Sequence, residues 1–355
     1  MKQKTLFLAC FLGILSAGSV MDVAAQSNAY QQTNLASSVP GLALQTDPNL
    51  VNPWGIALVG QTFFVADNRR GIVKTYDAFG DSVFPGMFAL FPSKLSNSRP
   101  MPSGIVANPT DEFVLNGFAS QVLIATEDGT ISGWATENGD LPQFASQAID
   151  NSLQRAVYKG IAILTPECCA PFLAVTNFNS GFVEPYTSFF APLAPPGSFT
   201  DPNLPAGYAP FGIQVIGNQV FVTYALQDAT KHDPVLGPGH GIVDIFDLEG
   251  NFVKRFATHG ALNAPWGVAK AGNFGRFSND ILIANFGDGT ISAYAPATGR
   301  FLGRLKDKSG AVIVNSGLRG LIFGKAGMGN PSTLYFVAGP NHGKDGLFGS
   351  ISVGN

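Results

Sequence analysis

Three short apolar segments follow one another early in the chain: Pro53-Trp54-Gly55-Ile56-Ala57, Phe63-Phe64-Val65-Ala66-Asp67 and Gly71-Ile72-Val73-Lys74-Thr75-Tyr76. Branched and aromatic residues predominate in them, and polar or glycine-containing turns separate them, which is the pattern of β-strands joined by hairpins. Their apolar residues stand at consecutive rather than alternate positions, so both faces of each strand are expected to be buried. The segments therefore predict antiparallel strands in a sheet that is covered on both sides.

The same order of segments occurs six times in the chain. The opening glycines are spaced 49, 56, 52, 55 and 53 residues apart, at Gly55, Gly104, Gly160, Gly212, Gly267 and Gly320. The second segment recurs as Val122 to Thr126, Leu173 to Asn177, Val220 to Tyr224, Ile281 to Asn285 and Leu334 to Gly339. A unit of roughly 50 residues with three or four strands is typical of a propeller blade, and such blades close into a ring. We therefore predict an all-β fold, a six-bladed β-propeller.

The segment before the first repeat completes the predicted ring. It contains the apolar stretch Leu35 to Leu44, and the last repeat stops soon after Ile351-Ser352-Val353. We expect a strand from residues 31–45 to join the last blade, because a closed ring leaves no open sheet edge. No linker-like segment interrupts the repeats, so residues 26–355 are predicted to form a single domain. Its blades are expected near residues 49–97, 98–150, 151–206, 207–260, 261–314 and 315–355.

The first 25 residues have the order of a secretory signal peptide. Lys2 and Lys4 precede the apolar run Leu6 to Leu15, and small residues lead up to Ala25. The run is shorter than the roughly 20 residues that cross a bilayer, and no later stretch reaches that length. We expect residues 1–25 to be cleaved, the mature protein to be secreted or periplasmic, and no transmembrane segment to be present.

Composition narrows the partners and the cysteine chemistry. Charged residues make up 13% of the chain and the formal net charge is −3, which gives no reason to expect nucleic acid as a partner. Only Cys168 and Cys169 follow the signal region, and adjacent cysteines cannot join distant segments. They form either a vicinal disulfide or two small side chains at a turn after Pro166, and we favour the second interpretation.

The repeat also resembles a known consensus. In its first copy the order Gly-Ile-Ala, Phe-Phe-Val-Ala-Asp-Asn and Ile-Val-Lys-Thr-Tyr-Asp is similar to the NHL repeat, whose members form six-bladed propellers. Motifs at residues 47–55, 262–267, 284–289, 338–340 and 346–349 resemble an uncharacterised secreted bacterial family, and this resemblance covers essentially the whole mature chain. The resemblance implies a fold and no established activity. Members of that family often end in a Pro-Glu-Pro sorting tail, which this sequence lacks, so release or periplasmic residence is expected rather than anchoring.

One column of residues is expected to face a mouth of the central channel. The residue before each opening glycine gives Trp54, Ser103, Lys159, Phe211, Trp266 and Arg319. Repeats three apart oppose each other in a six-membered ring, so Lys159 should face Arg319 and Trp54 should face Phe211. We predict that Trp54, Lys159, Phe211, Trp266 and Arg319 bind an anionic or sugar-like ligand by stacking and charged hydrogen bonds. The alternative is that they cap the core, with Lys159 and Arg319 paired to carboxylates such as Asp67 or Asp288.

A second column is expected at the same mouth, because the second strand of an antiparallel blade ends where the first begins. It consists of Asp67, Thr126, Asn177, Tyr224, Asn285 and Gly339. Asp67, Asn177 and Asn285 offer the oxygen ligands that a divalent cation such as calcium accepts. Asp and Asn also end strands because their side chains bond to the turn backbone, and we favour this structural interpretation.

The longest turn expected on that side is Ala225 to His240, which carries His232, Asp233 and His240. Long turns on rigid scaffolds often carry binding residues. The spacing of these side chains matches no known zinc motif, so a solvated loop is favoured over a metal site.

The sequence contains none of the common catalytic motifs: it has no Gly-x-Ser-x-Gly nucleophile elbow, no His-Glu-x-x-His metalloprotease helix and no phosphate-binding loop. We therefore predict an exported propeller that binds a ligand or a protein partner at this mouth, without evident catalysis and with no certain cofactor. The alternative function is a lactonase-like hydrolase or lyase that depends on a divalent cation held by Asp67, Asn177 and Asn285.

Overall fold

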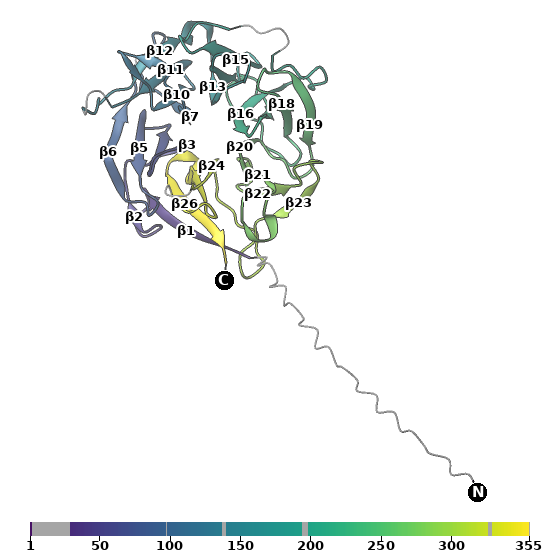
Figure 1. Cartoon of the computed structure of the whole chain (residues 1–355). Helices are drawn as coiled ribbons and strands as arrows, with labels where there is room; N and C mark the ends of the chain where they lie inside the picture. The colour runs from purple at the N-terminus through teal and green to yellow at the C-terminus, as the bar shows by residue number, and fades with distance from the viewer. Residues whose placement is uncertain (2–28, 97, 137–139, 194–197, 326–328, 355) are drawn as a thin grey trace.

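The computed structural model describes Met1 and residues 29–96, 98–136, 140–193, 198–325 and 329–354. In this part of the chain six sheets of three to five strands stand around a central channel (Figure 1). Each sheet is one blade, and its strands follow one another outward from the channel; neighbouring strands are antiparallel except for the outermost pair of blade 6, which is parallel. The prediction of an all-β, six-bladed β-propeller is confirmed.

The first three blades follow in chain order. Blade 1 contains β3 (Pro53–Val59), β4 (Thr62–Asp67), β5 (Ile72–Tyr76) and β6 (Ser82–Ala89). Blade 2 contains β7 (Pro102–Ala107), β10 (Val122–Thr126), β11 (Thr130–Trp134) and β12 (Ser146–Asp150), with the small ladder β8 (Val114–Leu115) and β9 (Phe118–Ala119) between its first two strands. Blade 3 contains β13 (Tyr158–Leu164), β14 (Phe172–Asn177) and β15 (Phe182–Thr187).

The last three blades have the same order. Blade 4 contains β16 (Tyr208–Ile216), β17 (Gln219–Leu226), β18 (Ile242–Phe246) and β19 (Phe252–Thr258). Blade 5 contains β20 (Pro265–Lys270), β21 (Ile281–Asn285), β22 (Ile291–Tyr294) and β23 (Phe301–Arg304). Blade 6 contains β24 (Leu318–Phe323), β25 (Leu334–Ala338), β26 (Leu347–Val353), β1 (Tyr30–Ser37) and β2 (Gln45–Thr46). Short helical turns lie at η1 (Ser152–Gln154), η2 (Gly275–Phe277) and α1 (Pro340–Gly343).

The opening glycines set the distance between blades. The innermost strands β3, β7, β13, β16, β20 and β24 each contact the next, and β24 returns to β3. A Cβ added at Gly55 would lie 2.6 Å from the carbonyl oxygen of Ser103, and one at Gly320 would lie 2.8 Å from that of Trp54. Any side chain here would push neighbouring inner strands apart, which explains why the repeat has glycine at this position.

The apolar core lies between neighbouring sheets. Phe63 packs against Tyr335 and Phe348 of blade 6, with ring centroids 4.4 and 5.5 Å away. The next residue, Phe64, faces the other side and lies 5.9 Å from Trp134 of blade 2. Successive side chains of a strand point to opposite faces, so both faces here are buried, and each such ring contributes about 1.5–3 kcal/mol. This arrangement explains the consecutive apolar residues in the repeat.

The N-terminal strand closes the ring. β1 pairs antiparallel with β26, from Tyr30 opposite Val353 to Ser37 opposite Leu347. The hydroxyl of Tyr30 donates a hydrogen bond to the carbonyl oxygen of Phe274 in blade 5, at 3.1 Å. The predicted closure of the last blade by an N-terminal strand is therefore confirmed.

Three further expectations concern the chain ends and the cysteines. Apart from Met1, the predicted signal peptide at residues 1–25 lies outside the described residues. Within the described ranges, every helix is too short or too polar to cross a membrane. Cys168 and Cys169 form a vicinal disulfide, so the favoured interpretation of two separate side chains is wrong. They stand in the tight connection between β13 and β14, where neighbouring residues can bring both sulfurs to the same side.

Candidate functional site

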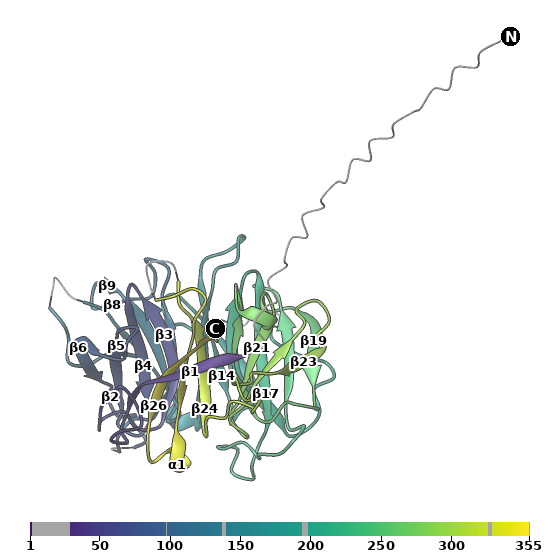
Figure 2. The ribbon, with the colours of Figure 1, turned by 90° about the horizontal axis from the view of Figure 1, so that it is seen from below.

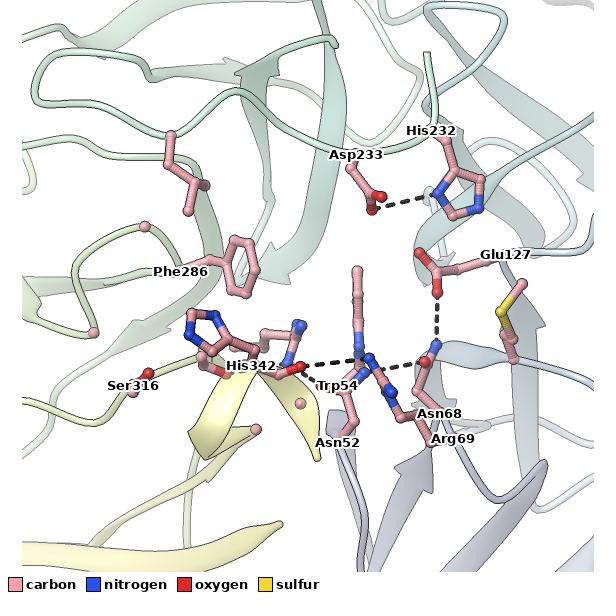
Figure 3. Close-up of a pocket in the computed structure, with 18 of the residues that line it drawn as sticks. Asn52, Trp54, Asn68, Arg69, Glu127, His232, Asp233, Phe286, Ser316 and His342 are labelled. Atoms are coloured by element: carbon pink, nitrogen blue, oxygen red, sulfur yellow. Dashed lines mark hydrogen bonds and ion pairs between the residues drawn. The ribbon is translucent and has the colours of Figure 1, made fainter. Parts of the chain in front are cut away.

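A cavity of about 920 Å³ opens at the mouth where the first strand of each blade begins. It lies on the side that carries α1, at the lower edge of Figure 2. Its floor is formed by Trp54 and Arg319, whose residues are only 3% and 5% exposed. Its walls include residues of blades 1, 2, 4, 5 and 6: Asn52, Asn68, Arg69, Arg99, Met101, Glu127, His232, Asp233, Leu236, Phe286, Asp288 and His342 (Figure 3).

Trp54 is the centre of an aromatic cluster at this floor. Its ring centroid lies 6.2 Å from that of Phe211, which stands on the opposite blade, and 6.4 Å from those of Trp266 and Phe286. The ammonium nitrogen of Lys159 lies 4.8 Å from the Trp54 ring centroid. Trp54 and Arg319 line the cavity, whereas Lys159 and Phe211 are fully buried and Trp266 lines a narrow space of about 30 Å³ further down the channel. The structure thus brings the five predicted residues together near the mouth. Two of them line the cavity, and the other three lie deeper in the channel or in the core.

Arg319 is a buried cation with unused hydrogen-bonding capacity. Its Cζ lies 4.0 Å from the Trp54 ring centroid and 4.4 Å from that of Phe286. Its Nη1 donates to Asn52 Oδ1 at 2.9 Å and to the carbonyl oxygen of Gly317 at 3.1 Å. Its Nε has no hydrogen-bond partner among the described residues, nor does Trp54 Nε1. Burial lowers the pKa of Arg319 to about 9, so the guanidinium is still charged at neutral pH.

Lys159 is paired with Glu127. Its ammonium group donates to Glu127 Oε1, and both side chains are buried. Asn68 Nδ2 donates to the other carboxylate oxygen of Glu127 at 2.7 Å, so this buried ion pair has the additional hydrogen bond that such pairs need. The carboxylate partner of Lys159 is thus Glu127, and not Asp67 or Asp288 as the alternative interpretation of the sequence proposed.

The loop between β17 and β18 brings His232 and Asp233 to the same part of the cavity (Figure 3). His232 Nδ1 lies 3.3 Å from Asp233 Oδ1, and that oxygen is 3.9 Å from the ammonium nitrogen of Lys159. The hydrogen bond with Asp233 raises the pKa of His232. The same hydrogen bond with His232 is the largest cause that lowers the pKa of Asp233. The nearby charges of Lys159 and Arg319 lower it further.

Glu127, His232 and Asp233 could also be considered as metal ligands. One ligand atom from each lies within 4.8 Å of the others. However, the Lys159 ammonium already contacts Glu127 and lies close to Asp233, so it supplies the positive charge that these carboxylates require. A divalent ion would have to displace it. His240, the other histidine of this loop, contacts the carbonyl oxygen of Val235 instead.

The second predicted column serves the backbone of its own blades. Asp67 Oδ2 accepts from Val51 N at 2.8 Å, Asn177 Oδ1 from Val157 N at 3.1 Å, and Asn285 Oδ1 from Asn263 N at 3.0 Å; each donor precedes the first strand of the same blade. None of these three side chains is part of the cavity lining. The metal set therefore stays a prediction, and the hydrogen bonds agree with the structural interpretation of these residues.

The residues that sequence reasoning missed lie one position further along the chain. Asn68, Glu127 and Phe286 directly follow Asp67, Thr126 and Asn285, and all three line the cavity. Phe178, which follows Asn177, packs on Phe211 at a centroid distance of 5.3 Å. Because successive side chains alternate between faces, the strand-end residue turns into the blade and the next one can turn toward the channel. A search at this neighbouring position would have found them.

Comparisons with known proteins give relatives without an established role. No protein-family model matches the chain. An uncharacterized protein of Acanthamoeba polyphaga mimivirus is 29% identical over 327 residues, covering 89% of this chain and 78% of the relative. A second one from the same virus is also 29% identical, covering 87% of this chain and 82% of the relative. These relatives are viral, whereas the sequence analysis expected a bacterial family; that expectation and the NHL assignment stay predictions.

Solved structures with a similar fold include two enzymes that are named after sugars. A glucose dehydrogenase aligns with a TM-score of 0.55 and 12% identity, covering 92% of this chain and 99% of that one. The PQQ-bound aldose sugar dehydrogenase of Streptomyces coelicolor aligns with a TM-score of 0.51 and 13% identity, with the same coverage. A Bacteroides thetaiotaomicron protein of unknown function reaches a TM-score of 0.55 at 10% identity, covering 91% of this chain and 76% of that one. At these identities the similarity shows that the chain shares the β-propeller fold.

Proposed function

We propose that this propeller binds a small anionic or sugar-like molecule in the mouth cavity. The observation that carries the proposal is that Trp54 and Arg319 both line the cavity and that each has a buried donor, Trp54 Nε1 and Arg319 Nε, without a hydrogen-bond partner among the described residues. Buried donors are nearly always satisfied in native proteins, and leaving one unsatisfied costs about 1–3 kcal/mol. A ligand with acceptor oxygens would recover that cost.

The size and chemistry of the cavity support a small molecule as the ligand. Its volume of about 920 Å³ lies in the range of ligand sites, which combine apolar walls with a few fixed polar groups. Here Met101, Leu236 and Phe286 supply apolar surface, and the exposed residues Arg69 and Arg99 supply guanidinium groups that can donate hydrogen bonds to ligand oxygens. Below the mouth the channel narrows to a space of about 30 Å³, so the ligand would enter and leave by this mouth.

The other predictions about function have less support. Sugar dehydrogenases of similar fold are compatible with a sugar-like ligand, but the proposal depends on the cavity and not on that similarity. A protein partner would have to reach the same recessed floor. The metal-dependent hydrolase stays a prediction, because the oxygens of Asp67, Asn177 and Asn285 are engaged by backbone groups. Export to the periplasm or medium is likewise proposed, from the pattern of residues 1–25.

The proposal can be tested by titration calorimetry with three matched probes: glucose, glucuronate and glucose 6-phosphate. We expect an anionic probe to bind more tightly than glucose, because a hydrogen bond from the Arg319 guanidinium to an anionic oxygen is stronger than one to a neutral hydroxyl group. Arg319→Gln should weaken that binding by about tenfold or more, the effect of losing a charged hydrogen bond. Arg319→Lys keeps the positive charge and loses the planar guanidinium group, so its affinity for the anionic probe should lie between those of the wild type and Arg319→Gln.

The controls separate binding from folding. Each variant is first checked by circular dichroism and thermal unfolding, since Arg319 is buried. Arg300→Gln removes an exposed arginine that does not line the mouth cavity and should leave the affinities unchanged. If none of the three probes binds the folded wild-type protein, or if binding is indifferent to both Arg319 substitutions, the proposed site is wrong.

A further inference from the structure

Asp233 is an exposed residue that reaches buried cations. Its side chain is 67% exposed, yet its Oδ1 lies 3.9 Å from the ammonium nitrogen of Lys159, which is fully buried. Figure 3 shows the Asp233 carboxylate turned into the cavity beside His232 and Glu127. A carboxylate on a loop thus stands inside the site proposed for a ligand.

The backbone, and not the ion pair, fixes the position of this loop. Asp228 N donates to the carbonyl oxygen of Asp233 at 2.9 Å, and Val235 N donates to that of Leu226 at 2.7 Å. These bonds continue the hairpin beyond β17, and Gly237 N anchors it to Asn263 Oδ1 at 2.8 Å. The Asp233 side chain, which is exposed, can therefore turn away from Lys159 without breaking these backbone hydrogen bonds of the loop.

The buried side chains at the floor of the cavity carry one more positive charge than negative charge. Lys159 and Arg319 are buried cations, and Glu127 is the buried anion that contacts Lys159. Asp233 brings the second anion, and it lies in the electrostatic field of both cations. With Asp233 turned out to solvent, one buried positive charge would lack a counter-ion, and burying an unpaired charge is costly.

We infer that the Asp233 carboxylate occupies the place of a ligand carboxylate, so that the natural ligand of the mouth is a small molecule with a single carboxylate that displaces it. This inference rests on the proposed function and specifies its ligand class. The incoming carboxylate would take the position of the Asp233 carboxylate beside His232 and Lys159. A monocarboxylate would replace the single negative charge of Asp233 one for one.

The inference predicts that Asp233 competes with the ligand. Asp233→Asn removes the internal anion and keeps the size of the side chain, so glucuronate should bind about threefold to fivefold more tightly, the factor that corresponds to one exposed ion pair. Glucose, which has no carboxylate, should bind the variant and the wild type equally. The measurement is titration calorimetry of both sugars with both proteins.

Asp288→Asn is the matched control. Asp288 also lines the cavity, but its carboxylate is paired with Arg304 at 3.4 Å and accepts from Thr290 N at 3.1 Å. The substitution removes the same charge from the same cavity without removing the contact with Lys159. Glucuronate affinity should therefore change less than twofold.

The outcomes separate this inference from the proposed function. Tighter glucuronate binding by Asp233→Asn, with glucose unaffected, supports it. If Asp233→Asn binds glucuronate no more tightly than the wild type does, the inference is wrong, and the proposed ligand site is unaffected. The same holds if the affinity for glucose rises as much as the affinity for glucuronate. Binding of glucose or glucose 6-phosphate that depends on Arg319, with no binding of glucuronate to either protein, also overturns the carboxylate inference alone. If no probe binds, both proposals fail.

Discussion

The two columns of residues that end at the mouth differ in what their side chains reach. The positions before the opening glycines include Trp54, Lys159 and Arg319, whose side chains meet at the centre of the ring. The ends of the second strands, such as Asn177, turn into their own blades and bond to backbone N–H groups. Both columns lie on the same side of the ring, so position along the strand is not enough to identify a site residue. The direction in which each strand presents its side chain decides whether that residue faces the centre of the ring or supports its own blade.

The largest expected effect comes from the first column. Lys159→Met should lower the free energy of unfolding by ~3–5 kcal/mol, because Glu127 is then a buried carboxylate without its cation. Glu127→Gln combined with Lys159→Met removes both charges and should recover much of the loss. Urea unfolding of the variants measures both values. Lys308→Met, at an exposed position, serves as the control and should change the stability by less than ~0.5 kcal/mol. A single variant as stable as the wild type would mean that the pair contributes nothing.

A smaller loss is expected from the second column, and without an effect on ligands. Asn177→Ala leaves the N–H groups of Val157, Asn179 and Ser180 without the Oδ1 acceptor, which should cost ~1–3 kcal/mol. The affinity for the probe that binds best should stay unchanged in the folded variant. Asn179→Ala, at a half-exposed neighbouring position, is the control in the same urea experiment. Loss of ligand affinity in Asn177→Ala would contradict the division between the two columns and would favour a metal or ligand role for Asn177.

The smallest step is a pH effect at Asp67. Burial raises the pKa of Asp67 to about 8, although Val51 N donates to its Oδ2. Between about pH 4 and pH 8 the folded state therefore keeps a proton that the unfolded state releases, and stability falls as the pH rises. The contribution is about 1.4 kcal/mol for the single unit from pH 6 to pH 7. Asp67→Asn cannot titrate, so its advantage over the wild type should grow by that amount across this unit. Urea unfolding at the two pH values measures it, and parallel pH profiles of the two proteins would show that Asp67 is ionised throughout.

Much of the fold could be predicted because the same pattern of three apolar strands occurs six times in the sequence. The glycine of each copy marks the close contact of two inner strands, and the consecutive apolar residues mark strands that are buried on both faces. The closing strand could be predicted because the last repeat lacks an outer strand. The vicinal disulfide could not, since the sequence around Cys168 and Cys169 is compatible with both states.

The candidate site could be predicted only in part. The column of Trp54, Lys159 and Arg319 follows directly from the repeat. Glu127 and Phe286 were missed because each lies one residue beyond a strand end, where a shift of one position reverses the direction of the side chain. The contact of Asp233 with Lys159 joins blade 4 to blade 3 through a loop whose conformation no repeat specifies. Regular elements are encoded by pattern, whereas contacts between loops depend on three-dimensional packing.

The pairing of β1 with β26 has a consequence for the order in which the molecule can form. Tyr30 lies opposite Val353, so the first strand of the propeller pairs with the last strand of the sixth blade. Blades 1 to 5 can stack one after another while the chain grows, but the ring stays an open arc until β26 has been made and can pair with β1. The mouth, which needs residues from both ends of that arc, such as Trp54 and Arg319, is assembled in the same final step. The growing chain therefore lacks this cavity until β26 has docked on β1.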